Sequence, residues 1–183
     1  MKLAFLVLAM VAVGCGSNGA VRVSITDDPA VGSVRQLLIT TNEVRIHDDA
    51  EETSTGGDAA AVADGATGHG WIVLCSTEQT FDLLQLTNGN TLPLCGGQAL
   101  TVPAGHVTQI RLGVKTAQLV LDGGATQDLV VPSGPSSGLK VNVGRDVAKD
   151  QTLDIKLDFD AASSLEQQGN GSWKLKPVLR VLP

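Results

Sequence analysis

The stretch that decides the fold reads Leu153-Asp154-Ile155-Lys156-Leu157-Asp158-Phe159-Asp160. Its apolar and charged side chains alternate strictly. Successive side chains of a β-strand point to opposite faces of a sheet, so the pattern predicts a strand with one face in a core and the other in water.

The same period of two recurs along the 183-residue chain. The other clear alternations span 21–26, 110–115, 139–144 and 173–181. Turn signals separate them, and only 81–86 and 161–168 favour short helical turns. We therefore predict an all-β fold, an antiparallel β-sandwich of about 7–9 strands of the immunoglobulin-like or prealbumin-like type.

Two segments depart from simple alternation. The apolar parity changes within 37–46, which indicates a bulge or a break near Thr41-Asn42. The segment from Asp48 to Gly70 is rich in Gly, Ala, Asp and Thr and has no apolar alternation. We expect one long mobile loop there.

The last predicted strand, 173–181, is basic on its polar side, where Lys176 and Arg180 lie. The polar side of 153–160 is mostly acidic. Because opposite charges that face each other across neighbouring strands stabilise a sheet, we expect these two strands to be antiparallel neighbours. Asp158 and Asp160 would then form cross-strand ion pairs, and a glycosidase-like carboxylate pair is the alternative.

The N-terminus has the pattern of an export signal. Lys2 precedes an apolar run, 3–13, that is too short to cross a bilayer. The run ends in Ala12-Val13-Gly14-Cys15, which resembles the lipobox of bacterial lipoproteins. Ala12 stands where Leu is usual, so cleavage by ordinary signal peptidase is the alternative.

This leader divides the chain into three parts. We expect a lipoprotein signal peptide at 1–14, lipid attachment at Cys15 within a short tether at 15–19, and a single β-sandwich domain at 20–183. Gly16 rather than Asp follows the cysteine. By resemblance to lipoproteins of two-membrane bacteria, this implies an outer-membrane lipoprotein of the cell envelope that faces the periplasm or the cell surface.

The composition limits the partners. The chain has 13 Lys and Arg against 19 Asp and Glu, a net charge of -6. This balance argues against binding nucleic acid or an anionic membrane through surface charge. Membrane attachment would therefore depend on the N-terminal lipid.

Cys75 and Cys95 are the two cysteines that remain when Cys15 is assigned to the lipid. In an exported protein, pairing of such thiols is the default, so we predict a disulfide between them. A redox pair or a metal site would need closely spaced cysteines or neighbouring histidines, which this part of the sequence lacks.

Acidic side chains gather at the end of one predicted strand, where His47, Asp48, Asp49, Glu51 and Glu52 follow one another. Their oxygen atoms could hold calcium. The spacing matches no calcium-binding loop, and a solvated acidic loop is the alternative. We expect no other cofactor.

No catalytic motif is found. The chain lacks the Gly-x-Ser-x-Gly nucleophile elbow, and 134–140 lacks the Gly-Lys-Ser/Thr order of a phosphate loop. We therefore predict that the protein is not an enzyme. A hydrolase that uses the carboxylates of Asp27 and Asp158 together with His47 is the alternative.

Two residues are candidates for ligand contact. Trp71 lies beside the predicted loop and is the one aromatic side chain that could serve as a platform for a sugar. Asp27 ends a predicted strand, and with Asp28-Pro29 it is expected to form a turn in which the carboxylates accept local amide hydrogen bonds.

The order of several short motifs resembles a known family. They are VSITDDP at 23–29, EVRIH at 43–47, WIVL at 71–74, DLLQL at 82–86, PAG at 103–105, QIRL at 109–112, LDFDA at 157–161 and LKPV at 175–178. This succession is similar to the bacterial lipoprotein domain-of-unknown-function family 4382 over about 20–182. The resemblance implies an exported, often lipid-anchored β-domain with no assigned activity and no catalytic residues to carry over.

Together these observations predict a lipid-anchored β-sandwich of the cell envelope. It would act as a non-catalytic binding or structural module for another envelope protein or a surface polymer. The alternatives are a carboxylate-dependent hydrolase and a calcium-stabilised structural domain.

Overall fold

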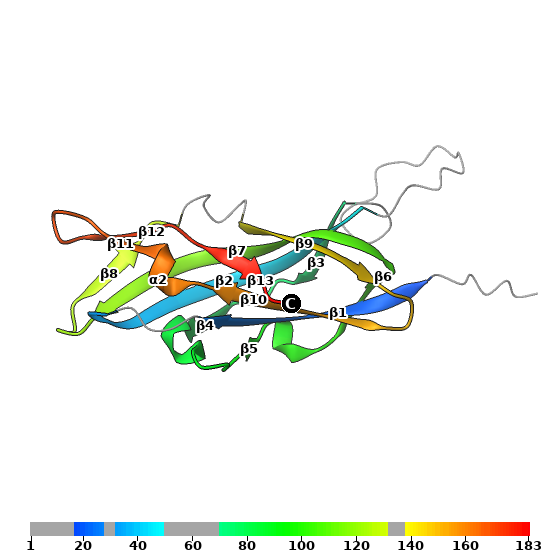
Figure 1. Ribbon diagram of the computed structural model, residues 1–183, viewed down its shortest axis with the longest axis horizontal. Coiled ribbons are helices and arrows are strands. Elements are labelled where there is room, and N and C mark those ends of the chain that lie inside the picture. The colour runs from blue at the N-terminus through cyan, green and yellow to red at the C-terminus, as the bar shows by residue number, and fades with distance from the viewer. Residues whose placement is uncertain (1–16, 28–31, 50–69, 132–137) are drawn as a thin grey trace, which may run out of the picture.

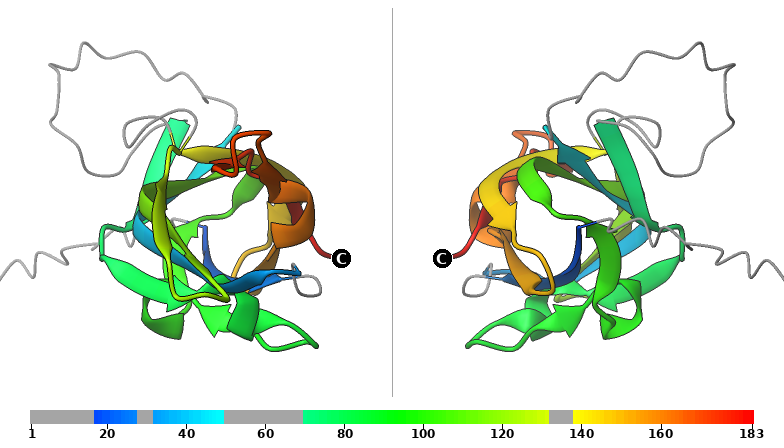
Figure 2. Two further views of the ribbon diagram at one scale, coloured as in Figure 1. Left: turned by 90° about the vertical axis from the view of Figure 1, so that its left-hand side faces the viewer. Right: turned by 90° about the vertical axis from the view of Figure 1, so that its right-hand side faces the viewer.

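The computed structural model describes residues 17–27, 32–49, 70–131 and 138–183, and most of them lie in strands (Figure 1). Two sheets face each other across one core, as the end-on views of Figure 2 show. The all-β sandwich is confirmed.

Sheet A contains β1 (Asn18–Asp27), β5 (Leu92–Pro93), β6 (Leu100–Pro103), β10 (Thr152–Phe159) and β13 (Leu179–Val181). Sheet B contains β2 (Val34–Asp48), β3 (Gly70–Cys75), β4 (Gln79–Asp82), β7 (Gly105–Leu121), β8 (Thr126–Leu129) and β9 (Leu139–Val147). A separate pair consists of β11 (Leu165–Gln167) and β12 (Trp173–Leu175). The short helical turns are η1 (Leu83–Leu86), η2 (Cys95–Gly97) and α2 (Ala161–Ser164).

Each sheet is built on two long central strands. In sheet B, β2 and β7 pair antiparallel, β3 and β4 share the free edge of β2, and β8 and β9 share the free edge of β7. Because short strands share an edge in this way, the described residues form more strands than the 7–9 expected. The core of sheet A differs, since β1 and β10 pair in parallel.

The parallel pair departs from the antiparallel expectation. Parallel neighbours need a long connection between them. Here every strand of sheet B lies between β1 and β10 in the sequence. The remaining strand pairs in the described ranges are antiparallel.

The stretch 153–160 forms β10 and behaves as its alternation predicts. Ile155, Leu157 and Phe159 are at most 1% exposed. They join a core that includes the alternate residues of β1 and, from sheet B, Ile46 and Ile110. Each such side chain contributes about 1.5–3 kcal/mol through burial, so this central packing holds the two sheets together.

The predicted last strand, 173–181, divides into β12 and β13. β13 pairs antiparallel with β10, as expected, and its register places Arg180 opposite Asp158. β12 pairs with β11 instead. The division falls at Pro177, which has no N–H to donate to a neighbouring strand, and the backbone N–H groups of Lys176 and Val178 on either side donate to Ser164.

The irregular features of β2 also agree with the sequence. The β2–β7 register shifts at Thr41, which confirms the predicted bulge. Opposite it, Gly113 leaves room for the neighbouring strand, because a Cβ there would lie 2.4 Å from Asn42 Oδ1. The expected loop falls mostly at 50–69, outside the described residues, and its flanking residues Asp48 and Gly70 pair in the β2–β3 ladder.

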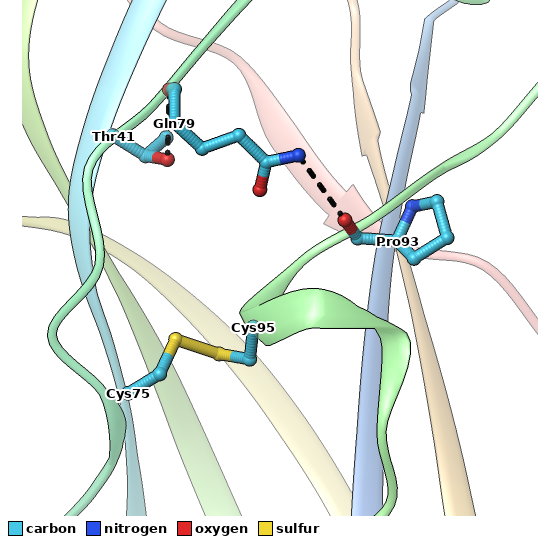
Figure 3. The surroundings of a disulfide bond; sticks show 5 residues. All are labelled: Thr41, Cys75, Gln79, Pro93 and Cys95. Atoms are coloured by element: carbon cyan, nitrogen blue, oxygen red, sulfur yellow. Dashed lines mark hydrogen bonds between the residues drawn. A yellow bond between two sulfur atoms is a disulfide. The ribbon is translucent and has the colours of Figure 1, made fainter.

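The predicted disulfide is confirmed. Cys75 at the end of β3 is bonded to Cys95 in η2, with a Cα–Cα distance of 5.6 Å (Figure 3). The backbone N–H of Leu94 donates to Val23 of β1 at 3.0 Å. Nearby, Gln79 of β4 donates to the carbonyl of Pro93 in β5 at 3.4 Å. The disulfide therefore links an edge of sheet B to a segment that is attached to sheet A.

Candidate functional site

The outer face of sheet B carries a row of cations. Cross-strand register places Arg45 opposite Arg111, and Arg111 opposite Lys140, on the three adjacent strands β2, β7 and β9. The intervening residues Ile46 and Ile110 are fully buried, so strand alternation turns these three cations to the outer face. We call Arg45, Arg111 and Lys140 the basic row.

A second row of side chains lies directly beside the basic row. Its members are Trp71 on β3, His47 on β2, Gln109 on β7 and Asn142 on β9, and each lies opposite the next on the neighbouring strand. We call these four residues the polar row. The two rows together form the candidate site.

Arg111 is the centre of this site. Its guanidinium carbon lies 3.6 Å from the centroid of the Trp71 ring, a close cation–π contact. The His47 ring meets the same tryptophan edge-on, with centroids 5.0 Å apart. Arg111 therefore covers one face of the Trp71 ring, and that face is not open to a sugar.

The cations of the basic row differ in their partners. Arg45 is ion-paired with Glu43. Among the described residues, Arg111 and Lys140 have no carboxylate partner, and the buried Nε of Arg111 makes no hydrogen bond. Arg111 thus keeps hydrogen-bonding capacity that its own surroundings do not use.

Of the five residues that were candidates for a metal, the structure describes His47, Asp48 and Asp49, and it separates Asp48 from the other two. His47 Nδ1 lies 3.1 Å from Thr108 Oγ1 and 3.3 Å from Asp49 Oδ1. Asp48, the next residue of the strand, is 5% exposed and packs against Gly105, where a Cβ would lie 2.7 Å from Asp48 Oδ1. His47 is partly exposed whereas Asp48 is buried, so the two side chains do not converge on one site.

Glu51 and Glu52, the other two members of that set, lie outside the described residues. Within the described ranges, no group of three or more His, Cys, Asp or Glu side chains is placed to hold a metal ion.

Asp27 has a long-range role besides the local turn that was predicted. It is 4% exposed, and its Oδ1 accepts a hydrogen bond from the backbone N–H of Ala161 at 2.9 Å. The carboxylate therefore joins the end of β1 to the start of α2, which is distant in sequence. The residues Asp28-Pro29 lie outside the described ranges.

The structure does not bring the residues of the hydrolase hypothesis together. Asp27 and Asp158 belong to sheet A, and Asp158 is ion-paired with Arg180 at 2.6 Å. His47 lies in the polar row on the outer face of sheet B. β1 and β2 also run in opposite directions along the molecule (Figure 1), so Asp27 and His47 lie towards opposite ends.

Comparison with known families adds one result. A family model described as a domain of unknown function, DUF4382, matches residues 18–177. The chain belongs to the DUF4382 family. A search of curated proteins found no match. The membership confirms the resemblance seen in the motifs, and it brings no assigned activity.

The helical turns η1, η2 and α2 are short. Among the described residues, none is both long enough and apolar enough to span a membrane.

Proposed function

We propose that this DUF4382 protein is a lipid-anchored, non-catalytic binding module of the cell envelope. Cys15 carries the lipid, and the folded domain begins a few residues later, because β1 starts at Asn18. Its partner is an envelope protein or a surface polymer that contacts the outer face of sheet B.

The observation that carries this proposal is Arg111. A cation that is half-buried, stacked on Trp71 and without a carboxylate partner among the described residues is unusual in a protein that has more acidic than basic side chains. The terminal Nη groups of Arg111, unlike its buried Nε, are not enclosed, and they have no acceptor among the described residues. Binding of a partner at this face would supply acceptors for these groups.

The anchor is tested at one residue. We expect Cys15→Ser to release the protein from the membrane fraction and to abolish lipid labelling. An intact mass that shows no lipid on the wild-type protein would contradict the anchor, whatever the domain binds.

The binding face is tested separately. Full-length protein on beads is exposed to solubilised envelope extract, and wild type is compared with the double variant Arg111→Met/Lys140→Met. The matched control is Arg22→Met, which removes an arginine from sheet A. We expect the wild type and the control to retain a component of the extract that the double variant does not retain. Equal retention by all three proteins would refute binding at the outer face of sheet B.

A further inference from the structure

We infer that the ligand of the two rows is an anionic polysaccharide, with its acidic groups along the basic row and its hydroxyl groups against the polar row. This inference rests on the proposed function and specifies the chemical class of the ligand. Three features of the site support it.

The first feature is the charge of the basic row. Like charges directly opposite each other on neighbouring strands destabilise a sheet, yet Arg45, Arg111 and Lys140 follow one another across three strands. The strand spacing of about 4.8 Å makes this row about 10 Å long. Glu43 offsets part of this repulsion at Arg45. A ligand with several acidic groups would offset what remains at Arg111 and Lys140, whereas one small anion would meet only part of it.

The second feature is the orientation of Arg111. The stacking on Trp71 covers one face of the guanidinium plane. The N–H groups of a guanidinium lie in its plane and form a fork that fits carboxylate, sulfate or phosphate oxygens in pairs. Because the ring contact already restricts the side chain, less conformational entropy is lost when an anion binds.

The third feature is the neutral polar row. The side-chain amides of Gln109 and Asn142 lie within 3.5 Å of each other beside the cations, and they offer both donors and acceptors, which sugar hydroxyls require. Because the net charge of -6 makes the rest of the surface repel a polyanion, binding of such a polymer would be confined to the two rows. A polymer with spaced acidic groups and neutral hydroxyls fits both rows.

Two other surfaces of the described residues lack this combination. A shallow depression beside β8 is lined by Val114, Lys115 and Asp128 among others, and it contains neither row. On the outer face of sheet A, Arg22 is ion-paired with Asp154 at 3.1 Å.

The experiment measures binding of full-length protein in detergent to three probes. These are polygalacturonate, uncharged dextran and poly-glutamate, which represent an acidic sugar chain, a neutral sugar chain and an acidic peptide. We expect the protein to bind polygalacturonate in preference to the other two. We also expect the affinity to fall several-fold between 50 and 200 mM salt, because the charges are exposed enough to be screened.

Variants locate the binding. We expect Arg111→Met to weaken binding of polygalacturonate by about tenfold or more, as for loss of a charged hydrogen-bonding group. Arg111→Lys, which keeps the charge and loses the planar fork, should recover part of the affinity. Arg22→Met, the matched control in sheet A, should bind like the wild type. Thermal unfolding of each variant checks that the fold is intact.

Several results would overturn the inference. Equal binding of dextran would exclude the role of charge, and preferential binding of poly-glutamate would indicate an acidic protein partner. No binding of any probe would also refute it. In these cases the proposed function still stands if retention of the envelope component depends on Arg111 and Lys140, so the two failures are distinguishable.

Discussion

The two outer faces of the sandwich use their charges differently. On sheet A, Arg22 is paired with Asp154 and Arg180 with Asp158. On sheet B, Lys115 is ion-paired with Glu78 and His106 lies against Asp146. The basic row differs, because its cations lie opposite one another and, within this row, only Arg45 has a carboxylate partner among the described residues. The ion pairs of sheet A therefore stabilise the fold, whereas the basic row of sheet B leaves binding capacity at some cost to stability.

The disulfide links sheet B to a segment attached to sheet A, and its removal is expected to have the largest effect on stability. The bridge has a sequence separation of 20 residues, for which loop closure suggests about 3 kcal/mol of stabilisation. We expect the double variant Cys75→Ser/Cys95→Ser to lose about that much free energy of unfolding in denaturant titration. An unchanged midpoint would show that packing alone holds β3 and η2 together.

A chemical control supports this test. Wild-type protein, denatured without reductant, should expose neither Cys75 nor Cys95 to alkylation, and reduction should expose both. Free labelling without reductant would contradict the bridge.

The second prediction concerns the outer face of sheet A, which we call the paired face because Arg22 and Arg180 are ion-paired there with Asp154 and Asp158. Asp158 is 1% exposed, and removal of the partner of a buried charge is strongly destabilising. The Arg180 side chain is 54% exposed, so water screens the pair and reduces the effect. We expect Arg180→Met to lower the free energy of unfolding by about 2 kcal/mol. A loss below about 0.5 kcal/mol would show that the pair contributes as little as an ordinary surface ion pair.

The third prediction makes the matched change on the other face. Arg111→Met removes a cation–π contact worth about 0.5–1 kcal/mol and also relieves like-charge repulsion of similar size with Arg45 and Lys140. We expect the free energy of unfolding to change by no more than about 0.5 kcal/mol. A loss comparable to that of Arg180→Met would mean that Arg111 is a structural residue, and the contrast between the faces would fail.

Much of the fold could be predicted from local pattern. Strict alternation identified β10 and the central part of β7, and the change of parity located the bulge at Thr41. The complementary charges of 153–160 and 173–181 predicted that the two stretches are antiparallel neighbours, which is the case for β10 and β13. These features depend on neighbouring residues or on one strand pair. The parallel pairing of β1 with β10 could not be predicted, because it depends on the order of strands within the sheet and not on the pattern of either strand.

The candidate site was predicted only in part. Trp71 and His47 were identified as candidates, and the structure brings them together. Arg111, Arg45 and Lys140 were missed because each is an ordinary polar position of an alternating strand. Only the register across β2, β7 and β9 makes them neighbours, and a single sequence does not contain that register. Asp27 was assigned to a local turn because its partner, Ala161, is far away in sequence.

The smallest predicted effect returns to the paired face, at the start of α2. Asp160 caps this turn, and its Oδ1 accepts a hydrogen bond from the Ser163 backbone N–H at 2.8 Å. This hydrogen bond is the main cause that lowers the pKa of Asp160 below its ordinary value of 3.8, burial opposes it, and the Ser163 side chain and the charge of Arg180 lower the pKa further.

A lowered pKa in the folded state means that the ionised form of Asp160 stabilises the fold. This contribution is fully present above the unfolded pKa, near 3.8, and is lost as the pH falls through the lower folded value. Asn caps a helix about as well as Asp does and does not titrate, so Asp160→Asn should cost at most about 0.5 kcal/mol at neutral pH. The measurement is the free energy of unfolding of both proteins between pH 2 and 7. The difference between them should disappear in acid, and a difference that stays constant across this range would show that the charge of Asp160 has no part in the stability of the paired face.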